Sequence, residues 1–369
     1  MTEVENTFKV AVVEKQLAEL WMQTTAEVDD EKAVLRARVA NLIIFVCNEE
    51  ALSEVSDSMQ SLTAAHPGRV MLVMGDRDAD DRDIEVSVKS LCQVDKRTGA
   101  RRLCGEQVTL KAQGTFVVEL PSAALPLLVP DLLTFVYWRD PMNTSEEVFS
   151  KLLVAADRLI IDSAEFREPK RELMQTNALF QQEVLQHARV SDLNWERLTL
   201  WRSLLADFYD VREYQKQLDQ MDSVRVEYVG SESQTTFVPP QPLLIVAWLA
   251  TRLGWTLTAT NSDQSFTFTD SRNRTISVEL NRVAAGTRKP GRLAAIKLSS
   301  GQTSFLVARS EDDTHILSEC HTRSEVKRGR VLPVRNRSLA QLLAREMEIL
   351  ANDRVYQEAV AMVSRMIET

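Results

Sequence analysis

Two cysteines in the first half of the sequence are the residues best suited to redox chemistry. Cys92 and Cys104 lie in two strand-like segments within residues 84–113, on either side of the turn-forming sequence DKRTGA. If the segments fold back about this turn, the cysteines reach nearly opposite positions, and Cβ atoms of cross-strand neighbours lie about 4.5–5.5 Å apart. A small adjustment would then permit a disulfide. The alternative, two reduced and partly buried thiols, is favoured because the expected compartment, the cytoplasm, is reducing.

Other residues that could catalyse a reaction lack partners in the sequence. Glu106 follows Cys104 within CGEQVTL, but no histidine is placed by the sequence to activate a cysteine–glutamate pair. Asp162 and Ser163 end a predicted strand, where α/β proteins often keep functional groups, although capping of the following helix is favoured. The four cysteines and four histidines show neither CxxC nor HExxH spacing, so no metal site is expected.

The first apolar strand does not lead into a cofactor-binding loop. Residues 39–47 (VANLIIFVC) are followed by NEEAL, which places Glu49 and Glu50 where a pyrophosphate would sit, and no GxGxxG is present. GxxxxGK[ST] and GxSxG are also absent from the sequence. We therefore predict no catalytic residues and no bound cofactor.

Charge is distributed unevenly along the chain. Residues 270–337 contain fourteen Lys or Arg and seven Asp or Glu, which gives this segment a net charge of +7. Because the whole chain has a net charge of −9, the other residues together carry −16. An acidic protein is a poor general nucleic-acid binder, but this basic segment could meet a phosphate or an acidic partner surface. The candidate docking residues are Arg288, Lys289 and Arg292. A solvated sheet face is the alternative.

A long amphipathic helix or helical hairpin is predicted over residues 191–221. Asp192 or Ser191 is suited to cap it, and apolar residues recur at helical spacing from Trp195 through Trp201 to Met221. Packing between two halves of the protein is the favoured interpretation. In the alternative, Trp195 or Trp201 anchors a partner, with Arg197 and Arg202 beside them, because Trp and Arg are enriched at binding hot spots.

The order of predicted elements indicates two different domains. Strands and helices alternate in residues 1–163, which predicts an α/β domain with a mostly parallel sheet, Rossmann-like but without the cofactor loop. Residues 164–222 are predicted as a helical connector. Residues 223–369 contain a proline-led helix, several short strands and two closing helices, which is typical of an α+β domain.

Length and composition agree with a two-domain cytoplasmic protein. The chain has 369 residues, of which 44% are hydrophobic and 26% charged, and its longest apolar runs are too short to span a bilayer. It opens MTEVENTF, with no basic region followed by an apolar one, so no secretion signal and no membrane partner are expected.

Several segments, in order along most of the chain, resemble the glucose-6-phosphate dehydrogenase assembly protein family, OpcA. They are HPGRVMLVMGD (66–76), LPLLVPDLLTFVYW (125–138), DRLIIDS (157–163), DLNWERLTLWRSLLADFYD (192–210), LLIVAWLATRL (243–253) and VYQEAV (355–360). The most specific portion contains Leu193, Trp195, Arg197, Thr199, Trp201 and Arg202.

The resemblance implies a non-enzymatic factor that binds the glucose-6-phosphate dehydrogenase oligomer and acts as its allosteric activator in the oxidative pentose phosphate pathway. In photosynthetic members it also implies thioredoxin-linked redox control, which would make Cys92 and Cys104 a redox pair. The competing hypothesis is an enzyme or sensor that binds a sugar phosphate or nucleotide through the basic C-terminal domain.

Overall fold

The computed structural model describes residues 10–26, 34–36, 38–94, 102–141, 146–181, 188–230, 237–286, 288–334, 336–349 and 351–368. The chain forms two compact units that interleave in sequence. The first comprises residues 1–162, 182–191 and 337–352, and the second comprises residues 163–181, 192–336 and 353–369. The segment 164–222, predicted as a helical connector, thus contributes residues 182–191 to the first unit and the rest to the second.

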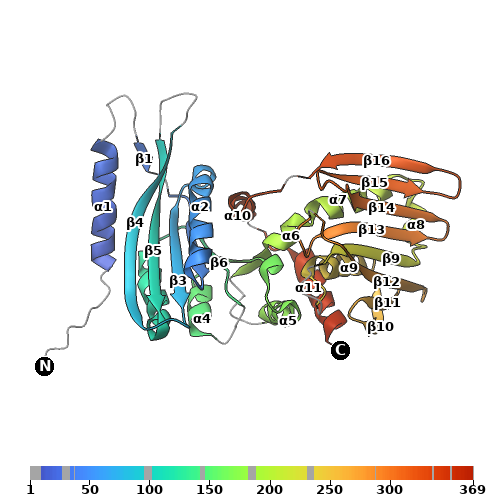
Figure 1. Cartoon of the computed structure of the whole chain (residues 1–369), viewed down its shortest axis with the longest axis horizontal. Helices are drawn as coiled ribbons and strands as arrows, with labels where there is room; N and C mark the ends of the chain where they lie inside the picture. Colours follow the sequence, from blue (N-terminus) through green and yellow to red (C-terminus); the bar gives the residue numbers. More distant parts are fainter. Residues whose placement is uncertain are drawn as a thin grey trace. The chain divides into compact units, whose positions relative to one another are not determined.

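The first unit is built on an eight-stranded sheet (Figure 1). Its order is β1-β5-β3-β2-β6-β7-β8, and β4 pairs with β5. Neighbouring strands from β1 to β7 pair parallel, whereas β4 and β5 pair antiparallel. The strands are β1 (Val34–Arg36), β2 (Asn41–Val46), β3 (Arg69–Asp76), β4 (Arg82–Val94), β5 (Arg102–Gln113), β6 (Thr134–Trp138), β7 (Arg158–Ile161) and β8 (Arg189–Asp192).

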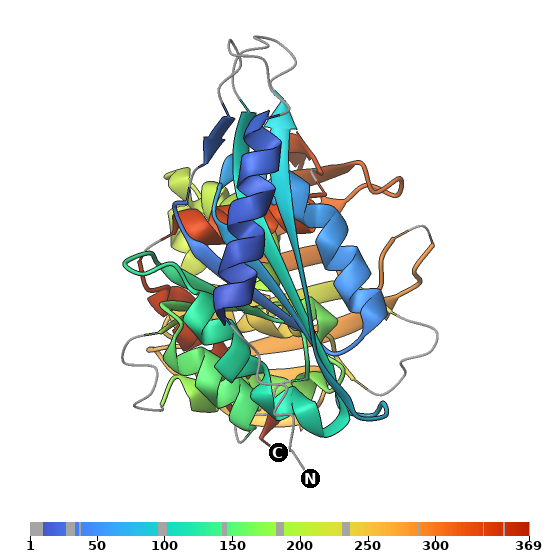
Figure 2. The same ribbon diagram turned by 90° about the vertical axis from the view of Figure 1, so that its left-hand side faces the viewer.

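Helices accompany this sheet, and among them is α10, which was predicted as part of the C-terminal domain but belongs to the first unit. They are α1 (Val10–Ala26), α2 (Glu49–Ala65), η1 (Gly114–Glu119), α3 (Leu120–Ala124), η2 (Leu125–Leu127), α4 (Glu147–Val154) and α10 (Leu339–Glu348). Helix α1 lies along β4, as Figure 2 shows. Helix α2 begins after Asn48, whose side chain accepts a hydrogen bond from the Ala51 N–H at 2.9 Å, and it joins the parallel strands β2 and β3. Strand β2, helix α2 and strand β3 therefore form a βαβ unit, in agreement with the predicted alternation of strands and helices.

The second unit contains another eight-stranded sheet, in the order β10-β11-β12-β9-β13-β14-β15-β16. Strands β9 and β12 pair parallel, and the other neighbours pair antiparallel. The strands are β9 (Ser223–Val229), β10 (Thr256–Ser262), β11 (Ser265–Thr269), β12 (Thr275–Val283), β13 (Leu293–Ser300), β14 (Thr303–Arg309), β15 (His315–His321) and β16 (Val326–Pro333).

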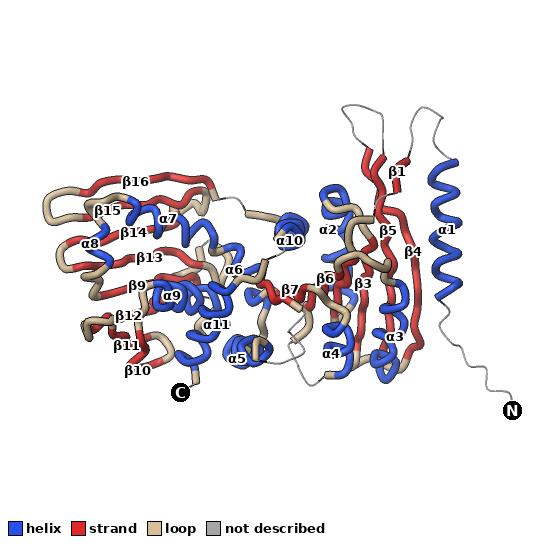
Figure 3. The backbone as a smooth tube through the Cα atoms, turned by 180° about the vertical axis from the view of Figure 1, so that it is seen from behind, coloured by secondary structure: helices blue, strands red, loops and turns tan. Residues whose placement is uncertain are grey.

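Helices cover one face of this second sheet. They include η3 (Ser163–Glu165), α5 (Pro169–Leu179), α6 (Leu193–Arg197), α7 (Thr199–Asp210), α8 (Gln215–Leu218), α9 (Pro240–Arg252) and α11 (Arg354–Ile367). Helices α7, α9 and α11 contact strands of the sheet (Figure 3), and Phe208 of α7 packs on Phe305 of β14 at 5.0 Å between ring centroids. Strand β12 alternates exposed and buried residues, as expected for a sheet with one packed and one solvated face.

The predicted fold class is confirmed, with an α/β first part and an α+β second part. Strands β1, β8 and β16 were not predicted. Residues 189–192 were expected to continue a polar helix, but they form β8, because the Arg189 N–H donates to the Asp157 carbonyl at 3.0 Å. Strand β16 was missed because its residues VKRGRVLP are charged or contain Gly and Pro, a composition typical of edge strands.

The described residues contain no helix with the length and apolar character needed to cross a membrane. The turn DKRTGA lies outside the described residues.

Candidate functional site

The carboxyl edge of the first sheet is the place where an α/β fold would hold a ligand. Here the chain fills that edge with its own side chains. Phe45 stacks on Trp138 at 4.2 Å between centroids, and the guanidinium of Arg77 lies 5.6 Å from the Phe45 ring and 2.7 Å from the Asp140 carboxylate. Glu49 at the start of α2 accepts a hydrogen bond from Lys111 at 2.8 Å. Carboxylates at a helix N-terminus occupy the position that favours anions, so this edge does not form a pyrophosphate cradle.

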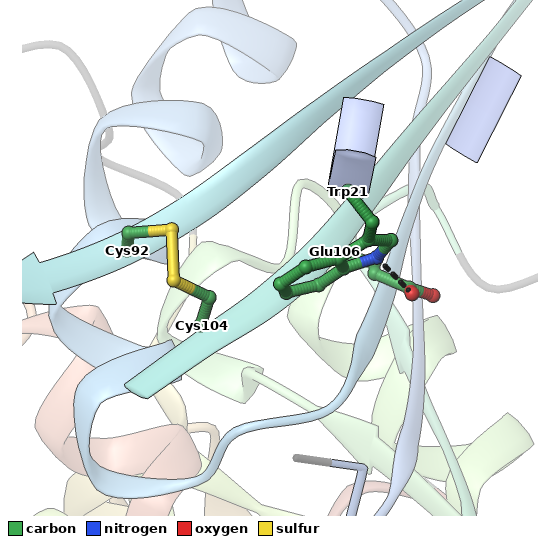
Figure 4. Close-up of a disulfide and its surroundings, with 4 residues drawn as sticks. All are labelled: Trp21, Cys92, Cys104 and Glu106. Carbon is green, nitrogen blue, oxygen red and sulfur yellow. Dashed lines mark hydrogen bonds between the residues drawn. A yellow bond between two sulfur atoms is a disulfide. The ribbon is translucent and has the colours of Figure 1, made fainter. Parts of the chain in front are cut away.

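Cys92 and Cys104 lie directly opposite each other in the β4–β5 ladder and form a disulfide (Figure 4). The prediction that they face each other is confirmed. The favoured expectation of two reduced thiols is wrong for this pair, because direct cross-strand pairing brings the Cα atoms within 4.1 Å. Cys104 is fully buried, whereas Cys92 is half-buried. Cys47 and Cys320 are not part of a disulfide.

Glu106, two residues after Cys104 on β5, is the centre of a buried cluster of charges. Its side chain accepts hydrogen bonds from the Trp21 indole N–H at 2.7 Å (Figure 4), from Arg38 at 2.7 Å and from Arg69 at 2.9 Å. Arg69 also donates to Glu14 at 2.5 Å and to the Leu127 carbonyl at 2.6 Å. Burial works to lower the pKa of Arg69, but the two glutamates outweigh it and raise the pKa.

We call Glu14, Trp21, Arg38, Arg69 and Glu106 the Glu106 cluster. It connects helix α1 with strand β5 and with the first residue of strand β3. Both carboxylate oxygens of Glu106 already accept hydrogen bonds from neighbouring side chains. A carboxylate held in this way stabilises the fold and has no oxygen left to act as a general base. The Cys104–Glu106 acid–base pair considered from the sequence is therefore not formed.

Both tryptophans of the most specific motif are buried inside the chain, with 4% of Trp195 and 1% of Trp201 exposed. The Trp195 indole N–H donates to Asp353 at 2.8 Å, and the guanidinium of Arg202 stacks over the Trp195 ring at 3.7 Å. Arg202 also donates to Thr199 at 3.0 Å, and burial lowers its pKa. This geometry agrees with core packing and leaves neither indole ring on the surface for a partner.

Asp192, which caps α6, organises a second buried network. It accepts hydrogen bonds from the Ser163 N–H at 2.9 Å, the Ser163 hydroxyl at 2.6 Å and the Asn194 N–H at 2.8 Å. The Tyr356 hydroxyl of α11 completes the set at 3.2 Å. Ser163, considered from the sequence as an active-site residue at a strand end, is thus a structural donor.

The structure brings together two candidate arginines that lie far apart in sequence. Arg197, at the end of α6, and Arg309, at the end of β14, both act electrostatically on Arg292, which precedes β13. All three are half-buried. Burial lowers the pKa of Arg292, and the positive charges of Arg309 and Arg197 lower it further, against a smaller opposite effect of Asp313. We call Arg197, Arg292, Arg309 and Asp313 the arginine cluster.

The other basic candidates lie in the loop between β12 and β13 and on strand β16. Arg288 is half-buried and donates to the Ala284 carbonyl at 3.1 Å, and Lys289 is exposed. On β16, Arg328 lies 3.6 Å from Glu319 and Arg330 lies 2.7 Å from Asp207, so these cations form surface ion pairs. Sequence reasoning missed Arg309, because no local pattern shows that the end of β14 meets α6.

Comparison with known proteins identifies the family. The N-terminal domain of the glucose-6-phosphate dehydrogenase subunit matches residues 59–178, and the C-terminal domain of that subunit matches residues 188–360. The chain belongs to the OpcA family of glucose-6-phosphate dehydrogenase assembly proteins.

Two curated relatives show how far the similarity extends. The OxPP cycle protein OpcA of Synechococcus elongatus is 28% identical over 305 residues, and that of Synechocystis sp. is 24% identical over 333 residues. The aligned regions cover 77% and 85% of this chain. The chain spans 64% and 66% of the two relatives' own lengths, about two thirds of each.

Among solved structures, a 3-ketoreductase from Actinomadura kijaniata, in complex with TDP-benzene and NADP, has a similar fold. The TM-score is 0.51 at 10% identity, and the match covers 89% of this chain and 96% of that one. At this identity the likeness concerns the fold alone. It agrees with a Rossmann-like first part followed by an α+β part.

Proposed function

We propose that this protein is a non-enzymatic assembly factor and allosteric activator of glucose-6-phosphate dehydrogenase in the oxidative pentose phosphate pathway. The observation that carries the proposal is the match of both OpcA domains, in order, to residues 59–178 and 188–360. The filled carboxyl edge of the first sheet supports it, because the side chains of Phe45, Trp138 and Arg77 occupy the place where a dinucleotide would bind. In this proposal the protein acts by contact with the dehydrogenase oligomer, in the cytoplasm.

The docking face that we propose is the basic loop between β12 and β13. The buried positions of Trp195 and Trp201 argue against direct anchoring by the motif helix, whereas Lys289 is exposed and Arg288 is half-buried. Complementary charge mainly raises the association rate, and added salt screens it.

The experiment mixes the purified protein with the dehydrogenase and measures turnover, oligomeric state and association rate over a salt series. Alone, the protein should turn over neither glucose 6-phosphate nor a nicotinamide cofactor, and together with the enzyme it should change the enzyme's kinetics. The double variant Arg288→Glu/Lys289→Glu should associate about tenfold more slowly at low salt. The matched control, Lys327→Glu/Arg328→Glu on β16, changes the charge equally and should associate like the wild type.

Two results would contradict the proposal. A dehydrogenase or lactonase rate that belongs to this chain alone, and that a point mutation in it abolishes, would make the protein an enzyme. An unchanged association rate for Arg288→Glu/Lys289→Glu at low salt, with normal folding, would remove the β12–β13 loop from the interface.

Redox control through Cys92 and Cys104 is the finer part of this proposal. A dithiol such as that of thioredoxin would attack the disulfide, become oxidised itself and leave two thiols on β4 and β5. The half-buried Cys92 is the more accessible of the two residues.

A further inference from the structure

Strand β4 forms an open edge of the first sheet. It pairs with β5 along one side, and the described residues make no backbone–backbone hydrogen bond to the other side of residues 84–92. From Glu85 to Cys92 the pairing with β5 has no register shift. Alternate residues therefore point their N–H and C=O groups outward in a regular row, and such a row is a template for another strand.

The other edges of the two sheets carry features that discourage such pairing. Strands β1 and β8 have only three and four residues, and β10 contains two register shifts. Strand β16 contains three cations, Gly329, Pro333 and a register shift. Short strands, bulges, charges and proline are the usual protections of an edge. Residues 84–92 contain neither Gly nor Pro, so β4 is the least protected of these described strands.

Helices α1 and α2 contact β4 from opposite faces of the sheet. Trp21 of α1 donates to Glu106, which lies opposite Ser90 in the β4–β5 ladder. The side chain of Lys89 points to the other face, because successive residues of a strand alternate, and it donates to Ser56 of α2 at 3.0 Å. Both helices therefore pack on the faces of β4 and add no strand to its edge.

The sequence of β4 is complementary to itself about Ser87. If two copies pair antiparallel with their Ser87 residues opposite each other, Glu85 of each copy lies opposite Lys89 of the other, and Val86 lies opposite Val88. The two charge pairs share the face on which Glu85, Ser87 and Lys89 are exposed, and the two valine pairs share the other face. Opposite charges and β-branched side chains are favourable cross-strand pairs.

The two charged side chains have only weak partners within their own chain. Glu85 lies 3.8 Å from Arg82, and 59% of its side chain is exposed. The acceptor that Lys89 meets in its own chain, the Ser56 hydroxyl, is neutral. Exposed contacts of this kind contribute little to stability, so both charges can turn to a second copy at small cost.

We propose that two copies of this chain associate by antiparallel pairing of their β4 strands about a two-fold axis at Ser87. The two first sheets then join into one continuous sheet, and each copy uses the same patch. Because the axis repeats every contact, each side-chain pair occurs twice. This association goes beyond the proposed function and stands whether or not the protein docks on a dehydrogenase.

The test measures the molar mass of the full chain alone, by sedimentation equilibrium over a concentration series. The wild type should approach twice the 41.8 kDa of one chain as the concentration rises. Glu85→Lys and Lys89→Glu should each raise the dissociation constant about ten- to a hundredfold, because each places like charges opposite each other at two positions. The double variant Glu85→Lys/Lys89→Glu should dimerise like the wild type, because opposite charges face each other again.

Glu279→Lys is the matched control. Glu279 is also a strand residue in an ion pair with an arginine, Arg225, and 53% of its side chain is exposed. It lies on β12, in the interior of the second sheet, and has no place in the proposed interface. Reversing its charge should leave the dissociation constant of the dimer unchanged.

An engineered cross-link tests the position of the axis, and it decides the question even if a charge reversal prevents folding. Ser87→Cys places two thiols at the axis, where Cα atoms of opposite residues lie about 4.5–5.5 Å apart, within the range of a disulfide. Mild oxidation should then yield a covalent dimer. Ser90→Cys is the control, because each Ser90 would lie about 10 Å along the strand from the axis, too far for its thiol to meet the other.

Three outcomes would overturn the proposal. The first is the mass of a single chain at every concentration. The second is a dimer that responds to neither Glu85→Lys nor Lys89→Glu, which would place the contact on another surface. The third is a double variant that does not recover, or a Ser87→Cys variant that cross-links no better than Ser90→Cys, because either result excludes this register. None of these measurements contains the dehydrogenase, so their failure would leave the proposed function standing.

Discussion

The Glu106 cluster of the first unit and the arginine cluster of the second unit treat buried arginines in opposite ways. In the Glu106 cluster, Arg38 and Arg69 share Glu106, and Arg69 also meets Glu14, so two positive charges face two negative ones. In the arginine cluster, the charged groups that act electrostatically on Arg292 are Arg309, Arg197 and Asp313. The pKa of Arg69 is raised, whereas the pKa of Arg292 is lowered.

This difference separates a role in folding from a role in binding. In the Glu106 cluster both carboxylate oxygens of Glu106 accept hydrogen bonds, and ion pairs of this kind offset the cost of desolvation and fix how α1 packs on the first sheet. Burial and neighbouring like charges lower the pKa of Arg292, and perturbed groups of this kind concentrate at functional sites. The comparison predicts that substitutions in the two clusters change stability in different ways.

The largest effect is expected from Glu106→Gln. The substitution leaves Arg69, which is 2% exposed, and the partly buried Arg38 without their shared carboxylate. Breaking a buried ion pair from one side costs about 3–5 kcal/mol, and we expect a loss of that size in the free energy of unfolding measured with urea. Glu85→Gln is the control, because Glu85 is 59% exposed and its contact with Arg82 is 3.8 Å long. A loss below about 1 kcal/mol for Glu106→Gln would show that the cluster does not hold the fold.

The disulfide beside the Glu106 cluster should have the next largest effect. Cys92→Ser/Cys104→Ser should lower the free energy of unfolding by about 2–4 kcal/mol, because the cross-link restricts the unfolded chain. Wild-type protein in excess dithiothreitol should lose the same amount, and the double variant should not respond to the reductant. If the reductant destabilises the double variant as much as the wild type, the effect does not come from this disulfide.

A smaller effect is expected in the arginine cluster. Asp313→Asn removes the carboxylate from a pair with 10% and 17% side-chain exposure, and should lower the free energy of unfolding by about 1–3 kcal/mol. Asparagine suits the positive φ of 56° at this position, so the backbone should not be strained.

Asp219→Asn is the matched control for that experiment, because Asp219 is 64% exposed in its pair with Arg272. It should change the free energy of unfolding by less than about 0.5 kcal/mol. Equal losses in Asp313→Asn and Asp219→Asn would mean that the Arg309–Asp313 pair contributes no more than an exposed ion pair.

Local sequence patterns determined most of the secondary structure. The continuous apolar runs around Ile43 and Val73 predicted the buried strands β2 and β3, because strands covered on both faces need no alternation. The period of three and four residues from Trp195 to Phe208 predicted a buried helical face, and both tryptophans are buried. Opposite placement of Cys92 and Cys104 followed from a short hairpin, in which pairing depends only on nearby residues.

Long-range pairing lay beyond the sequence patterns. Strand β8 has the polar sequence RVSD and is a strand only because the sheet beside β7 accepts it. Glu106 accepts hydrogen bonds from Trp21 of α1 and from Arg38, which lie 85 and 68 residues away from it in the sequence.

What the sequence determined by itself was therefore the local elements and the family to which they belong. Tertiary structure alone decided which charges are balanced. Arg197, Arg292 and Arg309 carry no shared motif, and only the folded chain couples Arg197 and Arg309 electrostatically to Arg292, where β13 and β14 pair with each other. The physical reason is that periodicity depends on neighbours within a few residues, whereas the balance of charge in a cluster depends on contacts between distant segments.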